Sequence, residues 1–488
     1  MRLGDLLAAG AAVDPTAVSG GQADGLLEGA RTVEVSGIAH DSRTVRPGDL
    51  FCCVPGAVHD GHDYAADAVA AGAVAVLTER PLAEIGLSSS GVPVVILPSV
   101  RRAMPLLAAA VHGHPSATLD VVGVTGTNGK TSVVHLLGAI LDAAGRRAAT
   151  WGTLSGGRTT PESTDLQATL ADWVADGAEV AAIEVSSHAL AQHRVDGTRF
   201  AAVAFTMLGR DHLDFHATMA DYEAAKARLF DGTFSGRAVV SVGDEAGRRI
   251  AAVAEDCGLE VVAVDPTTCE VRPTATGTEM RWRDRSVALT SGGAFMACNA
   301  LVAAELAILL GLEVDEVVAG LVGAPPVPGR FEPVLLDGGP GVVVDYAHTP
   351  DALAAVLDAA RRVLPDGGRL VVAFGCGGER DRGKRPEMGR VAEAGADRVV
   401  VTSDNPRGEP PEVIIADILS GMERQPDHVE PDRRRAIAGA LRDATPHDLV
   451  VVAGRGHETL QEVAGGAVSF DDRIAVAEEW ERVQEDTP

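Results

Sequence analysis

Short apolar runs alternate along the chain with stretches in which apolar residues recur at helical spacing. The runs "VAAIEV" and "FAAVAF" precede the helical stretch "MADYEAAKARLF", and "GVVVD" precedes "TPDALAAVLDAARRVL". Strands that alternate with helices predict a largely parallel sheet. Because such sheets bind ligands at the carboxyl ends of their strands, we expect functional residues in the polar loops that follow the runs.

The chain divides into three sections that differ in how regularly strand-like and helical stretches alternate. Residues 1–100 mix short strand-like runs with glycine and proline turns, and residues 101–328 alternate strand and helix more regularly. The segment 324–329, "APPVPG", can hardly continue a helix or a central strand, and a further series of strands and helices follows in residues 329–488. A length of 488 residues suits about three domains, so the sequence predicts a three-domain α/β protein.

Composition narrows the possible partners and the compartment. The formal charge of -27 argues against nucleic acid, and no run approaches the roughly 20 apolar residues of a membrane span. Asp5 interrupts the first apolar stretch and no basic segment precedes it, so we expect no signal peptide. The cysteines form no CxxC pair, which favours reduced thiols in a cytoplasmic protein; they are Cys52, Cys53, Cys257, Cys269, Cys298 and Cys376.

Residues 121–132, "VVGVTGTNGKTS", predict a strand, a tight loop and the start of a helix. The full phosphate-loop pattern G-x-x-x-x-G-K-[ST] lacks its first glycine, because Val124 stands there. The remaining glycines still let backbone N–H groups approach a phosphate, and a helix N-terminus favours anions. Lys130 suits the terminal phosphates and Thr131 suits Mg²⁺, which favours a phosphate site over an ordinary strand-to-helix turn.

Three further polar residues are ambiguous by themselves. Glu184 ends an apolar strand, where it suits either a second metal contact or a solvated carboxylate. His212 and His216 could share a helix face, but Leu213 stands where HExxH needs glutamate, which excludes a zinc protease. His212 is then either a single metal or phosphate ligand or a surface histidine, and Lys226 resembles an ordinary helix lysine.

Nine motifs together resemble the Mur ligase family, most closely its MurE type, in the family's order over essentially the whole chain. The motifs are "TGTNGKTS", "EVSSHALAQHR", "DHLDFH", "YEAAK", "GRFE", "DYAHTPD", "FGCGGERDRGKRPEMG", "SDNPRGEP" and "AGRGHE". The resemblance implies a UDP-sugar-binding domain, a central P-loop ATPase-like domain with a parallel sheet, and a Rossmann-like C-terminal domain that binds an amino acid. These correspond to residues 1–100, 101–328 and 329–488.

The same resemblance implies an ATP-dependent ligase of peptidoglycan precursor synthesis, and hence of cell-wall biogenesis, cell shape and division. In the family, ATP phosphorylates the D-Glu carboxylate of UDP-MurNAc-L-Ala-D-Glu. The amine of meso-diaminopimelate then displaces phosphate from this acyl phosphate. Phosphorylation supplies the leaving group that a carboxylate lacks, so catalysis is mostly positioning and charge neutralisation. We expect a cytoplasmic monomer with ATP and Mg²⁺ as cofactors.

Site residues carried over from the family fall into four groups. The residues that resemble ATP contacts are Gly126, Thr127, Asn128, Gly129, Lys130, Thr131, Ser132, Asn299, Arg330, Asp345 and His348. Thr131, Glu184, His212 and a carbamylated Lys226 resemble the Mg²⁺ ligands, and with Lys130 they make up the catalytic set. The residues that resemble contacts to the UDP-sugar dipeptide are Ser42, with neighbouring Arg43, and Thr159, Thr160, Ser186, Gln192 and Arg194. Those that resemble diaminopimelate contacts are Arg380, Asp404, Asn405, Arg407, Gly454 and Glu458.

Arg407 bears most directly on the choice of amino acid. An arginine in the loop "SDNPRGEP" can grip a carboxylate through two hydrogen bonds, and diaminopimelate has a distal carboxylate that lysine lacks. In the family, D-N-P-R accompanies diaminopimelate. Arg380 occupies the place of the last glycine of GxGxxG, which excludes a dinucleotide loop there.

Two departures from the family leave alternatives open. Met207 and Met296 replace family asparagines, and "SVGDEAG" is a degraded form of N-x-D-D-x-x-G. We weigh a diverged but active enzyme against a ligase for L-lysine or a specialised-metabolite substrate. A sister ligase resembling folylpolyglutamate synthetase or MurF would lack the D-N-P-R and "GHE" pairing. A non-catalytic UDP-sugar-peptide binding protein could dispense with Lys130, Glu184 and Lys226, which are present here.

Overall fold

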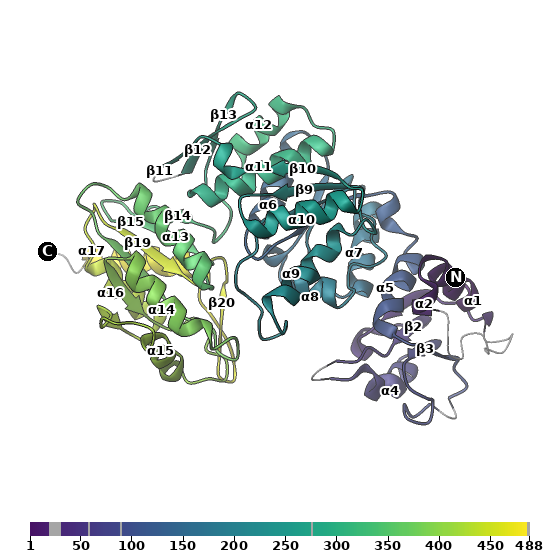
Figure 1. Ribbon diagram of the computed structural model, residues 1–488. Coiled ribbons are helices and arrows are strands. Elements are labelled where there is room, and N and C mark those ends of the chain that lie inside the picture. Colours follow the sequence, from purple (N-terminus) through teal and green to yellow (C-terminus); the bar gives the residue numbers. More distant parts are fainter. Residues whose placement is uncertain (19–30, 57–58, 88–89, 275–276, 486–488) are drawn as a thin grey trace.

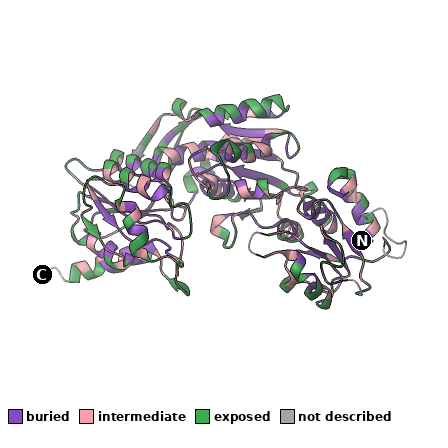
Figure 2. Cartoon of the chain, turned by 60° about the horizontal axis from the view of Figure 1, so that its bottom comes forward, coloured by how far each residue is buried: buried purple, intermediate pink, exposed green. Residues whose placement is uncertain are grey.

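The computed structural model describes residues 1–18, 31–56, 59–87, 90–274 and 277–485, arranged as three lobes in chain order (Figure 1). Each lobe has a β-sheet of its own. The strands are largely buried, whereas the helices expose one side and bury the other (Figure 2). This arrangement confirms the predicted three-domain α/β architecture. The boundaries near residues 100 and 328 stay a prediction.

The N-terminal lobe contains a four-stranded parallel sheet of order β1-β2-β3-β4. Its strands are β1 (Gly37–Ala39), β2 (Asp49–Cys52), β3 (Ala75–Thr78) and β4 (Val94–Ile96). Its helices are α1 (Leu3–Val13), α2 (Pro15–Val18), α4 (Ala65–Ala70) and α5 (Val100–Val111). Neighbouring residues of β2 face opposite ways, as the pleat requires: Leu50 packs with α1 and α5, and Phe51 packs with α4.

The middle lobe contains a six-stranded parallel sheet of order β10-β9-β8-β5-β7-β6. The strands are β5 (Asp120–Thr125), β6 (Ala148–Trp151), β7 (Val180–Glu184), β8 (Ala202–Phe205), β9 (Arg237–Ser241) and β10 (Glu260–Val264). One face packs on α6 (Lys130–Ala143), α11 (Ala294–Leu309) and α12 (Val314–Gly323), and the other packs on α7 (Ser163–Ala175) and α10 (Glu245–Asp256). The short helices α8 (Ser187–Ala191) and α9 (Met219–Ala227) follow β7 and β8 in the chain.

Two features of the middle lobe differ from the expectations. A three-stranded antiparallel sheet of β11 (Val271–Thr274), β12 (Gly277–Trp282) and β13 (Arg285–Leu289) packs beside α11 and was not predicted. The prediction that His212 and His216 share a helix face is wrong. They lie in the loop before α9, which begins only after Thr218 caps its N-terminus.

The C-terminal lobe contains a mixed six-stranded sheet of order β14-β15-β19-β16-β17-β18, in which only β14 is antiparallel to its neighbour. Its strands are β14 (Glu332–Val334), β15 (Gly341–Asp345), β16 (Leu370–Phe374), β17 (Arg398–Val401), β18 (His428–Val429) and β19 (Leu449–Ala453). One face packs on α13 (Pro350–Val363), α14 (Lys384–Gly395) and α15 (Pro411–Leu419). The other packs on α16 (Arg433–Arg442) and α17 (Asp472–Glu485), and β20 (Leu460–Val463) and β21 (Gly466–Ser469) form a separate hairpin.

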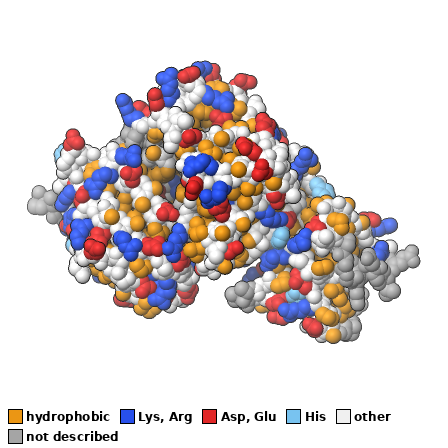
Figure 3. Space-filling view, viewed as in Figure 1, with side chains coloured by type: hydrophobic (Ala, Val, Ile, Leu, Met, Phe, Trp, Pro, Cys, Tyr) orange, Lys and Arg blue, Asp and Glu red, His pale blue; other side chains and the backbone are white. Residues whose placement is uncertain are grey.

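The surface carries charges of both signs, and the cysteines differ in their exposure. Basic and acidic side chains are interspersed on the face shown in Figure 3. Among the described residues, no helix has the length and apolar character needed to cross a membrane. The cysteines are free thiols, of which Cys52, Cys53 and Cys376 are buried and Cys257 is exposed.

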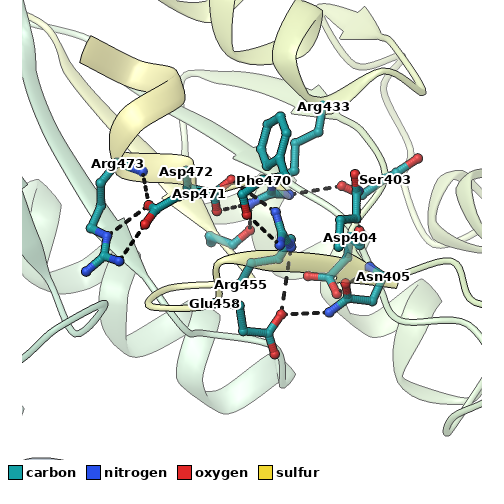
Figure 4. A network of polar contacts seen from close by, with 12 residues as sticks. Ser403, Asp404, Asn405, Arg433, Arg455, Glu458, Phe470, Asp471, Asp472 and Arg473 are labelled. Carbon is teal, nitrogen blue, oxygen red and sulfur yellow. Dashed lines mark hydrogen bonds and ion pairs between the residues drawn. The ribbon is translucent and has the colours of Figure 1, made fainter. Parts of the chain in front are cut away.

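A buried ion pair joins the loops at the carboxyl end of the C-terminal sheet (Figure 4). Arg433 makes two hydrogen bonds of 2.7 Å to Asp472 and donates to the backbone oxygens of Ser403 and Ala453 at 3.0 Å. The side chains of Arg433 and Asp472 are 1% and 0% exposed. The pair therefore fixes the starts of the loops after β17 and β19 against α17.

We expect Arg433→Met to lower the free energy of unfolding by about 3–5 kcal/mol, because it removes both short hydrogen bonds to the buried Asp472 carboxylate and leaves it, among the described residues, only Arg455, at 3.8 Å. Denaturant unfolding of the purified protein measures this change. Arg362→Met is the matched control, since its pair with Asp358 is 59% and 63% exposed and should contribute less than about 1 kcal/mol. Equal effects of the two substitutions would contradict the prediction.

Candidate active site

The phosphate loop lies between β5 and α6, as the sequence predicts. Gly126 and Gly129 have φ angles of 149° and 91°, which side chains rarely adopt. A Cβ atom on Gly126 would overlap Oγ1 of Thr206, and one on Gly129 would overlap the side chain of Asn299. These glycines let the backbone lie close to its neighbours at the N-terminus of α6, where an anion is favoured.

Two lysines contact the carbonyl oxygen of Gly126. Lys130 Nζ donates to it at 2.8 Å and to the Thr127 oxygen at 2.9 Å, and Lys226 Nζ donates to the Gly126 oxygen at 2.9 Å. The Lys226 residue is only 1% exposed. Burial, reinforced by the charge of Lys130, lowers the pKa of Lys226 well below its ordinary value and so favours the neutral amine.

Acidic side chains approach this loop from two other elements. Glu184, at the end of β7, accepts hydrogen bonds from Thr153 N at 2.8 Å and Thr153 Oγ1 at 3.2 Å. Its charge opposes the lowering of the pKa of Lys130 that burial causes. The charge of Asp211 likewise opposes the lowering of the pKa of Lys130. The Asp211 carboxylate lies 3.4 Å from His212 Nε2 and 3.8 Å from His348 Nε2.

The ionisation of Asp211 and His212 suits metal binding. Burial alone would raise the pKa of Asp211, but His348 and His212 lower it well below the ordinary value. Burial lowers the pKa of His212 to about 4, so its imidazole is neutral at pH 7 and offers a lone pair. The carboxylate of Asp211, which was not predicted, lies beside the predicted ligand.

The predicted metal ligands fit Mg²⁺ only together with other oxygen donors. No group of three or more His, Cys, Asp and Glu side chains within the described ranges is close enough to hold a metal ion. Thr131 Oγ1, which accepts a 3.1 Å hydrogen bond from Arg330, and the Glu184 carboxylate are hard oxygen ligands. The remaining positions would fall to phosphate oxygens and a carboxylated Lys226, so the donor set fits the ion when nucleotide is present.

A cavity of about 310 Å³ lies between the middle and C-terminal lobes beside this loop. Its lining includes the predicted ATP contacts Asn128, Gly129, Ser132, Asn299, Arg330 and Asp345. Arg330 lies over the ring of Tyr346, 4.5 Å from the ring centroid. Asp345 accepts hydrogen bonds from the backbone of Phe331 and Ala347 at 2.6 and 2.7 Å, and burial raises its pKa to about 6. Asp345 therefore orders the turns that line the cavity.

The two methionines that replace family asparagines occupy different environments. Met207 lines the cavity, and its backbone oxygen accepts a 2.8 Å hydrogen bond from Thr127 N. Met296 is completely buried in the apolar core between the sheet and α11. Only Met207 therefore lies where it can contact a bound nucleotide.

A second cavity, of about 410 Å³, lies between the N-terminal and middle lobes and includes the predicted residue Ser42 with Arg43 in its lining. Arg101, Arg158 and Glu162 also line it. Glu162 is paired with Arg158 at 2.7 Å, with Arg194 at 3.0 Å and with Arg101 at 3.7 Å. Glu162, which was not predicted as a site residue, connects this cavity to the middle lobe.

The predicted dipeptide contacts form one hydrogen-bonded cluster next to Glu184. Thr160 Oγ1 donates to the Glu184 backbone oxygen at 2.8 Å and accepts from Ser186 N at 3.0 Å. Arg194 donates to the Thr160 oxygen at 3.1 Å and to Gln192 Oε1 at 2.7 Å. Thr159 Oγ1 lies 3.4 Å from Thr153 Oγ1. Polar groups thus run from the N-terminal cavity to the phosphate loop.

The predicted amino-acid contacts lie on loops after three adjacent strands, β19, β16 and β17. Asn405 Nδ2 donates to Glu458 at 2.7 Å (Figure 4), and a Cβ atom on Gly454 would overlap Asp404 Oδ2. Burial, with the nearby charge of Asp404, raises the pKa of Glu458.

Both predicted arginines of this set border one glycine. A Cβ atom on Gly377 would lie 3.1 Å from Arg407 Nη1 and 3.7 Å from Arg380 Cγ. Arg407 donates to the Gly378 oxygen at 2.9 Å and pairs with Glu462 at 2.6 Å, whereas Arg380 is exposed. The sheet order thus brings these six residues into neighbouring loops.

The loop that carries His212 also contacts the C-terminal lobe. Arg210 N donates to Asp351 Oδ2 at 2.9 Å, and the Arg210 side chain pairs with Glu387 of α14. With the approach of Asp211 to His348, these contacts tie a loop of the middle lobe to α13 and α14. The sequence offered no sign of this connection, because the partners are more than 130 residues apart.

Three linked α/β lobes, a glycine-rich phosphate loop and a cavity between lobes define a multidomain nucleotide-binding enzyme. The Mur ligase family catalytic domain matches residues 34–116, the Mur ligase middle domain matches 124–307, and the Mur ligase glutamate ligase domain matches 329–456. The chain belongs to the Mur ligase family of ATP-dependent ligases.

Curated relatives named UDP-N-acetylmuramoyl-L-alanyl-D-glutamate–2,6-diaminopimelate ligase match most of the chain. The relative from Alkalilimnicola ehrlichii is 42% identical over 91% of this chain and 94% of its own length, and that from Xylella fastidiosa is 43% identical over 91% and 93%. A solved structure with the same name is 30% identical, covers 100% of both chains and has a TM-score of 0.65. A Thermotoga maritima MurF ligase in complex with ADP shares the fold at 19% identity and TM-score 0.65, over 95% of this chain and 100% of its own.

Proposed function

We propose that this chain joins meso-diaminopimelate to UDP-MurNAc-L-Ala-D-Glu, using ATP to activate the D-Glu carboxylate. The observation that carries the proposal is the polar path from the Ser42 cavity through Glu162 and Thr160 to Glu184 and the phosphate loop. A UDP-sugar bound at one end of this path would extend its peptide carboxylate toward the terminal phosphate of ATP. The names of the relatives supply the substrates.

The chemistry requires two substitutions at different centres. The carboxylate attacks the γ-phosphate to give an acyl phosphate and ADP, and the amine then attacks the acyl carbon and releases phosphate. Neither step needs a covalent enzyme group, so positioning and charge neutralisation dominate. Lys130 and Arg330 would neutralise phosphate charge, and Asn299 would contact the nucleotide in the cavity that it lines. We assign the other predicted ATP contacts, Thr127 and His348 included, to the same site.

The ligands that would hold Mg²⁺ are Thr131, Glu184, His212 and a carboxylated Lys226. When it is bound, the ion offsets the negative charge of the phosphates. We propose that Lys226 reacts as the neutral amine with CO₂ to give a carbamate and a proton. The burial of its Nζ atom and its lowered pKa support this reaction, because only the neutral amine is nucleophilic. The product is an oxygen ligand in place of a cation.

We also propose that the enzyme acts in the cytoplasm as a monomer, within peptidoglycan precursor synthesis. The free cysteines support this compartment, since they form no disulfide among the residues described. To the UDP-sugar dipeptide we assign Ser42, Thr159, Thr160, Ser186, Gln192 and Arg194. Arg380, Asp404, Asn405, Arg407, Gly454 and Glu458 are assigned to diaminopimelate.

Phosphate release is the direct test of this function. With ATP, Mg²⁺ and UDP-MurNAc-L-Ala-D-Glu present, we expect turnover on adding meso-diaminopimelate, and mass spectrometry should detect the tripeptide product. L-Lysine is the matched substrate, because it lacks only the distal carboxylate. Product with lysine alone would contradict the amino-acid assignment, and no turnover with either would favour a different substrate or a binding protein.

A further inference from the structure

We propose that Arg385 is a positioning residue for the incoming amino acid, because it holds together the two loops that carry Arg380 and Arg407. The inference rests on the proposed function, which assigns these two arginines to diaminopimelate. Arg385 is the second residue of α14, directly after the Arg380 loop, and its side chain is 0% exposed. It would act through the loops without contacting the substrate.

The guanidinium of Arg385 has partners on three separate segments. Its Nη1 donates to Asp417 on α15 at 2.9 Å. Its Nη2 donates to the Gly377 backbone oxygen, after β16, at 3.2 Å and to the carboxylate of Glu409, after β17. A single buried cation therefore connects the loop of Arg380 to the loop of Arg407.

Backbone contacts complete the link between the same loops. Gly378 N donates to the Asn405 oxygen at 2.9 Å, and Arg407 Nη1 donates back to the Gly378 oxygen at 2.9 Å. Glu379 and Arg407 have φ angles of 54° and 53°, a region that residues other than glycine adopt at a cost. Neighbouring contacts must hold these conformations, and Arg385 supplies contacts to both loops.

The residue type also matters here. The planar guanidinium presents several N–H groups in fixed directions, which suits partners on different segments, whereas a lysine ammonium is a compact charge on a flexible stem. Arg382 provides an internal comparison, because it pairs with the same acids, Asp417 at 3.0 Å and Glu409 at 3.9 Å. Its side chain is 59% exposed, and among the described residues its guanidinium donates hydrogen bonds to Asp417 and to no loop carbonyl.

Steady-state kinetics of Arg385→Lys and Arg382→Met test the inference. We expect Arg385→Lys to raise the KM for diaminopimelate about tenfold or more, with the KM for ATP and the kcat at saturation within about twofold of the unmodified enzyme. Arg382→Met should leave all three within about twofold. A purely structural defect would instead lower the active fraction and hence kcat, without selectivity for one substrate.

Glu409→Gln is the second variant, because it weakens the ion pair between Arg385 and Glu409 and leaves the buried arginine in place. This variant should also raise the KM for diaminopimelate, and it tests the inference by itself if Arg385→Lys does not fold. An unchanged KM for diaminopimelate in an active variant would overturn the inference, as would equal changes for all substrates. Failure of the unmodified chain to use diaminopimelate would instead contradict the proposed function.

Discussion

Replacing Lys226 with alanine should lower ligase turnover at least about 100-fold, because it removes a buried group from the centre of the phosphate site. Lys226 Nζ shares the Gly126 oxygen with Lys130, and no other lysine contacts that oxygen among the hydrogen bonds of the described chain. The assay is phosphate release with all substrates saturating. The unfolding temperature, measured in parallel, separates lost catalysis from lost structure.

Lys226→Arg distinguishes a carbamate from a simple cation. Arginine keeps the positive charge but forms no carbamate under these conditions, so we expect the variant to be as inactive as Lys226→Ala. The enzyme without any substitution should lose turnover when it is freed of CO₂ at low pH, and it should regain turnover when bicarbonate is restored. Full activity of Lys226→Ala would contradict both roles, and an active Lys226→Arg would contradict carbamylation alone.

Arg407→Met should raise the KM for diaminopimelate by roughly 10- to 100-fold, with little effect on the KM for ATP. A charge-assisted hydrogen bond to a carboxylate contributes about 1.5–3 kcal/mol, and every 1.4 kcal/mol corresponds to a factor of ten. Arg407 is the only group that we assign to donate two hydrogen bonds to the distal carboxylate, and the substitution removes it. Steady-state kinetics with one substrate varied at a time measures the change.

Arg407→Lys is the matched control, because it keeps the charge and loses the planar fork. It should fall between the unmodified enzyme and Arg407→Met. Any slow reaction with L-lysine should be unaffected by either change, since lysine presents no distal carboxylate. Equal losses for diaminopimelate and lysine would show that Arg407 supports the loop and does not read the substrate.

The local elements were predictable because each depends on neighbouring residues. The strand ending at Glu184, the glycine loop before Lys130 and the helix capped by Thr349 lie where the apolar pattern and capping residues place them. The sheet β11–β13 was missed because β12 and β13 are short, and their alternation rests on only two large apolar residues each, Met280 with Trp282 and Val287 with Leu289. The spacing of four residues between His212 and His216 suggested a shared helix face, although both residues lie in the loop before α9.

The contacts of the site could not be predicted in the same way. Glu162, Asp211 and Thr153 acquire their importance from partners that only tertiary folding brings near, such as Arg101 and His348. Polar residues in loops carry no periodic signal. The family resemblance could name Glu184 and Arg194, but it could not indicate what they touch. The functional roles of all these residues stay predictions until the kinetic measurements are made.

The attachment of the Arg210 loop to α13 and α14 has a thermodynamic consequence for ligand discovery. Because one loop belongs to the nucleotide site and is bonded to the lobe that holds the amino-acid loops, we expect the two sites to share a conformational equilibrium. Such coupling is reciprocal: the factor by which ATP tightens amino-acid binding equals the factor by which the amino acid tightens ATP binding. A compound directed at the loops around Arg407 would then be under-rated by any screen run without nucleotide.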